Sequence, residues 1–92
     1  MIRDVRISKQ AEKSLRKLPR HVIVALAAWM EAVELRGLDE VRKIPGYHDE
    51  PLHGARSGQR SIRLNRSWRA FYVIVRERVV FVEVIEINHH EY

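Results

Sequence analysis

The chain has 92 residues, of which 46% are hydrophobic and 32% are charged, and its net charge at pH 7 is +5. This composition excludes a disordered chain and favours one folded, soluble domain over residues 1–92. The absence of cysteine excludes disulfides and thiolate metal sites, and it favours a cytoplasmic location.

No segment of the sequence predicts contact with a membrane. The first residues are not followed by the apolar stretch that is typical of a signal peptide. The longest apolar run, Val22 to Met30, is far shorter than the ~20 residues that span a bilayer. We therefore expect no membrane partner.

The first part of the chain predicts a strand and a helical hairpin. Residues 2–7 alternate, imperfectly, between apolar and polar side chains, as in a short strand. Ser8 is a suitable N-cap, and apolar residues then recur at helical spacing over residues 9–36. Pro19 divides this stretch into two helices, and Gly37 is well placed to end the second one.

Residues 38–58 are expected to form a long loop that can contain a short helix. The loop holds five residues that interrupt regular structure: Pro45, Gly46, Pro51, Gly54 and Gly58. A loop of this length in so small a domain is often functional.

The last third of the chain predicts three strands. Residues 59–64 alternate polar with apolar, whereas residues 68–75 and 79–88 are rich in Val, Ile, Phe and Tyr on both faces, as in central strands. The connections at 65–67 and 76–78 have hairpin length. We therefore expect an α+β fold: an N-terminal strand, then the helical hairpin packed on one face of a three-stranded antiparallel meander.

Large aromatic residues are expected to pack inside this fold: Trp29, Phe71, Tyr72 and Phe81. Trp68 is also expected to pack on the sheet, but because it opens a strand after a basic turn, stacking on a nucleic-acid base is the alternative. Arg69 lies among apolar neighbours, where a charged side chain needs a partner or a ligand.

Positive charge is concentrated between Pro51 and Val75, a stretch without Asp or Glu. This stretch contains five arginines: Arg56, Arg60, Arg63, Arg66 and Arg69. The planar guanidinium group matches the oxygens of a phosphate. The distribution therefore favours an anionic partner, either a nucleic acid or an acidic protein segment.

The sequence ends in polar residues: Asn88, His89, His90, Glu91 and Tyr92. RNA cleavage requires one proton to leave the 2′-hydroxyl, one to reach the leaving oxygen, and stabilisation of the charged phosphorane. Imidazole is suited to both proton transfers and arginine to the third task. The alternative is a solvated chain end without a chemical role.

A zinc site is a second interpretation of the histidines, and we expect no metal here. Neighbouring residues on a strand point to opposite faces, so His89 and His90 cannot easily share one ion. His48 and His53 lie in the loop, and no cysteine is present to complete a set of ligands.

The run from Pro51 to Leu64, followed by Trp68-Arg69-Ala70-Phe71-Tyr72, resembles the core of RelE/StbE-type toxins within the RelE/ParE superfamily, and HigB in particular. The ending from Asn88 to Tyr92 is similar to the polar tails of the same group. The resemblance covers essentially the whole chain. It implies a bacterial, cytoplasmic toxin that a cognate antitoxin holds inactive, and that enters the ribosome and cleaves mRNA without a metal or other cofactor.

The resemblance also implies site residues. Arg63 and Arg69 match basic residues of two meander strands, His53 matches a lysine of the HigB loop, and Glu91-Tyr92 match an Asp-Tyr pair of the tail. HigB continues with a terminal histidine, and its loop histidine falls near Glu50 here. His89 and His90 are our candidates for those proton transfers. The candidate catalytic set is listed here in full: Arg63, Arg69, His89, His90, Glu91 and Tyr92.

The candidate RNA-binding set is separate: His53, Arg56, Arg60, Arg66 and Trp68. Two other functions remain open, because RelE-like ribonucleases and ParE-like gyrase poisons share a scaffold. One is a non-nucleolytic toxin that binds DNA gyrase, and the other is a decayed toxin that only binds its antitoxin. In each case we expect DNA contact only through the antitoxin complex.

Overall fold

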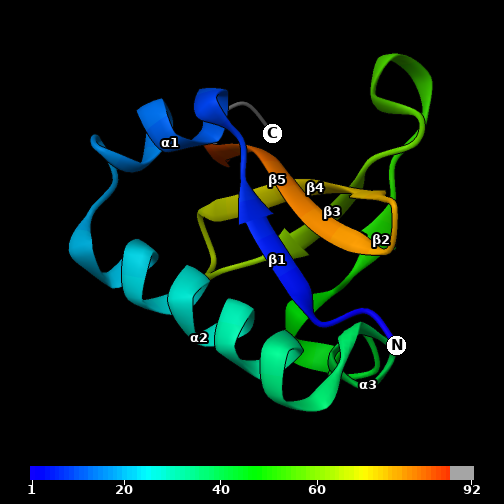
Figure 1. Ribbon diagram of the computed structural model, residues 1–92. Coiled ribbons are helices and arrows are strands. Elements are labelled where there is room, and N and C mark those ends of the chain that lie inside the picture. Colours follow the sequence, from blue (N-terminus) through cyan, green and yellow to red (C-terminus); the bar gives the residue numbers. More distant parts are fainter. Residues whose placement is uncertain (88–92) are drawn as a thin grey trace.

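The computed structural model describes residues 1–87 (Figure 1). The strand β1 (Asp4–Ile7) is followed by the helices α1 (Lys9–Leu15), α2 (Arg20–Arg36) and α3 (Leu38–Val41). The second half contains β2 (Glu50–Pro51), β3 (Arg60–Arg63), β4 (Trp68–Val75) and β5 (Arg78–Glu86). The short 3₁₀ helices η1 (Pro45–Tyr47) and η2 (Gly54–Arg56) lie on either side of β2.

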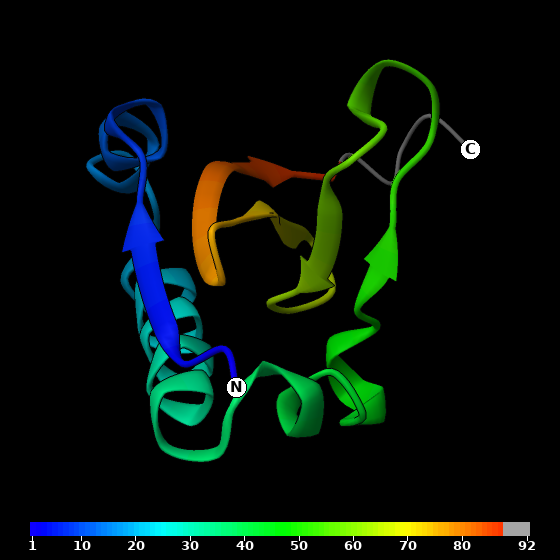
Figure 2. The ribbon, with the colours of Figure 1, turned by 45° about the vertical axis from the view of Figure 1, so that its right-hand side comes forward.

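The strands form one mixed sheet in the order β1-β5-β4-β3-β2. β1 runs parallel to β5, and all other neighbours are antiparallel. The predicted α+β class and the meander β3-β4-β5 are confirmed. The sheet curves strongly, so that β1 and α2 lie on one side of the molecule and β2 on the other (Figure 2).

The helical hairpin begins and ends where the local sequence requires. The Ser8 hydroxyl oxygen accepts a hydrogen bond from the Ala11 amide at 3.1 Å and caps α1. Gly37 ends α2 with φ +87°, a conformation that favours glycine. A side chain at this position would also meet Met1, because an added Cβ would lie 2.9 Å from the methionine sulfur.

The core lies between α2 and one face of the sheet. α2 contributes a stripe of fully or almost fully buried side chains: Val22, Leu26, Trp29 and Val33. The Trp29 ring lies 5.4 Å from the Tyr72 ring and 5.2 Å from the Phe81 ring, centroid to centroid. The expected packing roles of these aromatic residues are thus confirmed.

The long loop predicted for residues 38–58 contains more structure than expected. α3, η1, β2 and η2 all lie within it, and β2 adds a strand to the edge of the meander. The turn predicted at residues 76–78 is also shorter, because Arg78 already belongs to β5. Within residues 1–87, no helix is both long and apolar enough to cross a membrane.

Candidate nucleic-acid interface

The face of the sheet away from α2 carries the arginines that define the candidate site. Ala70 and Tyr72 of β4 belong to the core beneath α2, so the alternating residues Arg69 and Phe71 point to the opposite face. Residues directly opposite on antiparallel strands share a face. We call this face, with the side chains described below, the outer face.

Two cross-strand rows run side by side on the outer face. In one row Arg63 of β3 lies opposite Arg69 of β4. In the next row Ser61 of β3 and Glu83 of β5 lie on either side of Phe71. The outer face therefore places a pair of cations next to an aromatic ring that is flanked by a hydroxyl and a carboxylate.

The Arg63–Arg69 pair is unfavourable in the protein alone. Like charges directly opposite on a sheet repel each other. The Arg69 Nη1 atom is buried and has no hydrogen-bond partner within the described part of the chain. Arg63 donates a long bond of 3.4 Å from Nε to the Asn65 carbonyl oxygen. An anion bound between the two guanidinium groups would remove the repulsion and supply the missing acceptor.

A shallow depression of ≈330 Å³ lies beside Arg63 of this pair. Its walls are formed by η1 and the end of β3, through Ile44, Gly46, Tyr47, Arg63 and Leu64. The depression is largely apolar apart from the Arg63 guanidinium, so it offers a base or ribose an apolar surface next to a cation.

Arg56 is engaged within the protein on the same face. Its guanidinium carbon lies 4.2 Å from the centre of the Phe71 ring. Its Nη2 atom donates to Glu83 Oε1, and its Nη1 atom donates to Gln59 Oε1 at 2.9 Å. These contacts hold η2 over the sheet.

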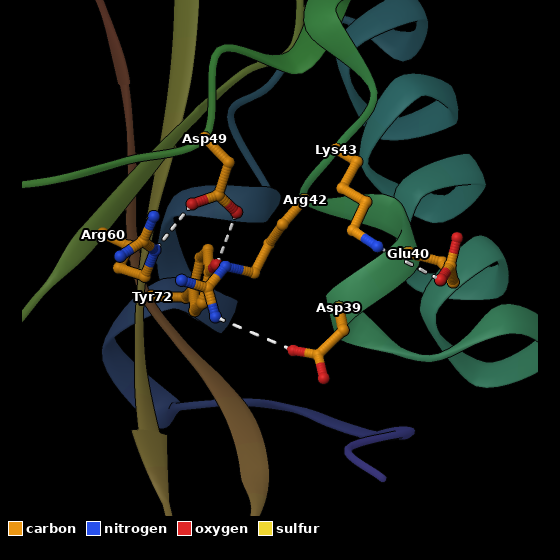
Figure 3. A network of polar contacts seen from close by, with 7 residues as sticks. All are labelled: Asp39, Glu40, Arg42, Lys43, Asp49, Arg60 and Tyr72. Atoms are coloured by element: carbon orange, nitrogen blue, oxygen red, sulfur yellow. Dashed lines mark hydrogen bonds and ion pairs between the residues drawn. The ribbon is translucent and has the colours of Figure 1, made fainter.

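Arg60 lies on the opposite face, where it joins a buried network (Figure 3). Asp49 is completely buried and accepts from Arg60 Nε at 2.6 Å and from the Tyr72 hydroxyl. Burial disfavours the charged form of Arg60, but the hydrogen bond and charge of Asp49 outweigh it, so the pKa of Arg60 lies above its ordinary value. Burial, and then the bond to Asp49, raises the pKa of the Tyr72 phenol.

The remaining sequence-predicted residues lie around the turn between β3 and β4 and in the loop before β3. Trp68 is half-buried and packs against the core, and the Asn65 side chain fixes the turn by accepting from the Ser67 and Trp68 amides at 2.8 and 3.0 Å. Arg66 is exposed in this turn, and His53 is exposed at the start of η2. The RNA-binding roles assigned to these residues stay predictions.

His89, His90, Glu91 and Tyr92 lie outside the described residues. The described chain ends at Ile87, whose amide donates to the Ser67 carbonyl oxygen. The last described residue is therefore held beside the β3–β4 turn, next to the strand ends that carry Arg63 and Arg69. Among residues 1–87, no three His, Asp or Glu side chains gather in a group that could hold a metal ion.

The partners Asp49 and Glu83 were missed by sequence reasoning. Both acids contact an arginine of the basic stretch, yet they lie outside it, at 11 and 27 positions from their partners. Of the two, only Glu83 could have been recognised from the sequence. It lies within an apolar strand, where a carboxylate needs a partner.

Comparison with known proteins identifies the fold. No protein-family model matches the sequence, and no curated protein matches it significantly. The structure is similar to YafQ from E. coli, with a TM-score of 0.74 and 19% identity over 90% of this chain and 91% of YafQ. It is also similar to the archaeal RelE–RelB complex from Pyrococcus horikoshii (TM-score 0.70, 18% identity, 97% and 99% covered).

A third similar structure is the RelBE2 toxin–antitoxin complex from Mycobacterium tuberculosis, with a TM-score of 0.64 and 24% identity over 90% of this chain and 95% of the other. The TM-scores of these three structures establish a shared fold.

Proposed function

We propose that this chain, which has the fold of the RelE/ParE toxins, is the toxin of a type II toxin–antitoxin pair and cleaves messenger RNA on the ribosome. The Arg63–Arg69 pair carries the proposal. Two adjacent cations, one with a buried unpartnered donor, are arranged as a phosphate-binding site that is empty of counter-charge from the described residues. A gyrase-binding toxin has no need of such a site.

The proposed chemistry is general acid–base cleavage of the RNA backbone. Arg63 and Arg69 stabilise the negative charge that develops on the scissile phosphate. A base removes the proton of the 2′-hydroxyl, that oxygen attacks the phosphorus, and an acid protonates the leaving 5′-oxygen. We assign the proton transfers to His89 and His90, and orientation of the RNA to Glu91 and Tyr92.

A cognate antitoxin is the second proposed partner. The net charge of +5 and the arginines of the outer face favour an acidic or amphipathic segment that wraps this surface. The similar archaeal structure is a complex of RelE with RelB, and RelBE2 from Mycobacterium tuberculosis is a toxin–antitoxin complex. Co-expression with each neighbouring open reading frame, followed by co-purification, tests this partner.

One pair of assays tests the proposed activity. The purified protein is added to a cell-free translation reaction, and primer extension maps breaks in the mRNA. A gyrase supercoiling assay is run beside it. We expect ribosome-dependent breaks and unchanged supercoiling. Intact mRNA together with inhibited gyrase would replace the proposal with the ParE-like function.

A further inference from the structure

The Arg56 side chain lies on the outer face in the way that a bound ligand would. The carbon of its flat guanidinium group lies over the Phe71 ring, 4.2 Å from the ring centre. Two different nitrogens on one edge of this group donate to two separate acceptors, Glu83 Oε1 and Gln59 Oε1. The arrangement is therefore an aromatic platform with two acceptors at its rim, filled by a planar group that has two neighbouring N–H donors.

Guanine is the nucleobase that matches this description. Its Watson–Crick edge presents the N1–H and the N2 amino group side by side. Adenine and cytosine present one donor beside an acceptor, and uracil presents one donor between two acceptors. Sequence-specific recognition of single-stranded RNA commonly combines stacking on an aromatic ring with hydrogen bonds to this edge.

Neighbouring groups fit the rest of a nucleotide. Arg69 lies two residues from Phe71 on the same face of β4, about 7 Å along the strand, which is comparable to the spacing between a base and its own phosphate. Ser61 lies opposite Phe71, and its hydroxyl is buried without a hydrogen-bond partner among the described residues. Buried polar groups of this kind are usually satisfied by a ligand or water.

We infer that Phe71, Glu83 and Gln59 form a recognition site for a guanine base of single-stranded RNA, which the Arg56 side chain fills when no RNA is bound. This inference rests on the proposed function, because it requires RNA to reach the outer face. Arg56 is then displaced from Phe71 when guanine binds, and its guanidinium is released to the RNA backbone.

Binding of uncleavable RNA tests the site without relying on nuclease activity. The probes are 2′-O-methylated pentamers of uridine with guanine, inosine or adenine at the centre, measured by fluorescence anisotropy. Inosine lacks the N2 amino group and so loses one of the two donors. We expect the guanine pentamer to bind about tenfold more tightly than the adenine pentamer, with inosine between them.

Two variants and a matched control locate this preference. Glu83→Ala removes one of the two acceptors and should bring the guanine-to-adenine affinity ratio close to one. Glu86→Ala removes the same side chain from the exposed end of the same strand and should keep the ratio. Arg56→Ala removes the occupant, so the ratio should be kept or increased, while affinity for all three pentamers falls with the lost charge. Thermal melting confirms that each variant is folded.

The inference is overturned by equal affinity of the wild-type protein for the three pentamers, by no binding at millimolar concentration, or by a preference that survives in Glu83→Ala. Loss of the preference in Arg56→Ala also overturns it, because Arg56 would then read the base itself. A guanine preference without mRNA cleavage leaves this site standing and removes the nuclease. Cleavage of mRNA without a guanine preference supports the nuclease and overturns this recognition site.

Discussion

Arg63 and Arg69 face each other directly across β3 and β4, and the Arg69 guanidinium keeps a buried donor without a partner in residues 1–87. The two residues are separated by the tight turn that Asn65 fixes, so their relative position is set by local structure. Repulsion between the two cations destabilises the protein when no anion is bound. Such an unfavourable arrangement is expected where a protein binds an anion.

Replacement of Arg69 should therefore separate activity from stability. Arg69→Ala is expected to slow mRNA cleavage by roughly 10²-fold or more, the scale of losing one donor to a transition state. The melting temperature should not fall much, because the repulsion with Arg63 disappears together with the side chain. Arg20→Ala, which removes an exposed charge from α2, should leave cleavage unchanged. A folded Arg69→Ala protein that binds ribosomes and cleaves at the wild-type rate would falsify the assignment.

The Asp49 network should contribute to stability. Asp49→Asn leaves the largely buried Arg60 guanidinium without its counter-charge, and we expect a loss of roughly 2–3 kcal/mol in the free energy of unfolding. Urea denaturation measures this difference. Asp39→Asn is the matched control, since the Asp39 side chain is 85% exposed and should change stability by no more than ~0.5 kcal/mol. Equal effects of the two substitutions would contradict a structural role for Asp49.

Tyr72 should make part of this stability depend on alkaline pH. The pKa of its phenol is raised in the folded protein by burial and by the bond to Asp49. Below the unfolded-state pKa of about 10 both states keep the proton, and the stabilisation is complete. Above that value the unfolded chain loses the proton first, so stability falls as the pH rises.

Comparison with Tyr72→Phe isolates this effect from the titration of other groups. At neutral pH the wild-type protein should be more stable than the variant by about 1–2 kcal/mol, through the hydrogen bond to a carboxylate. This difference in unfolding free energy should shrink as the pH is raised above about 10. A difference that stays constant between pH 8 and 11 would show that the phenol does not titrate differently in the two states.

Removal of residues 89–92 should abolish cleavage and leave the fold almost intact, because Ile87, which follows β5, and its bond to Ser67 precede them. If His89 or His90 is the base, activity should rise with pH through an imidazole pKa of about 6 to 7. His89→Ala, His90→Ala and Tyr92→Phe, each assayed for cleavage and melting temperature, separate the roles. Activity that is lost only together with stability would indicate a structural role.

Local signals were sufficient to predict the helices and the meander. Pro19 and Gly37 mark the limits of α2, and Trp29 lies on the apolar stripe that the sheet buries. The turn at Arg76 and Glu77 was predicted from its length and not from its residue types. Both residues adopt positive φ angles, 51° and 62°, which suit the twist of a hairpin but are normally adopted by Asn or Gly.

The different environments of the arginines were not predicted, because they depend on contacts with residues far away in the sequence. Arg56 and Arg60 belong to one basic stretch, yet Arg56 contacts Glu83 on the outer face and Arg60 contacts Asp49 in the core. Their separate environments follow from the register of β3 against β4, which places Arg60 opposite Tyr72. Charge composition alone cannot distinguish a cation that is neutralised internally from one that is left for a ligand.

The parallel pairing of β1 with β5 has a consequence for biosynthesis. Asp4 is translated well before its strand partner Arg78. Until then the β1 edge lacks its neighbour, and the apolar residues Val5 and Ile7 are without the strand that completes their packing. The sheet is thus assembled only after β5 has been made, and contacts of this sequence separation slow folding. A nascent chain interrupted before β5 would expose an unpaired strand edge prone to aggregation.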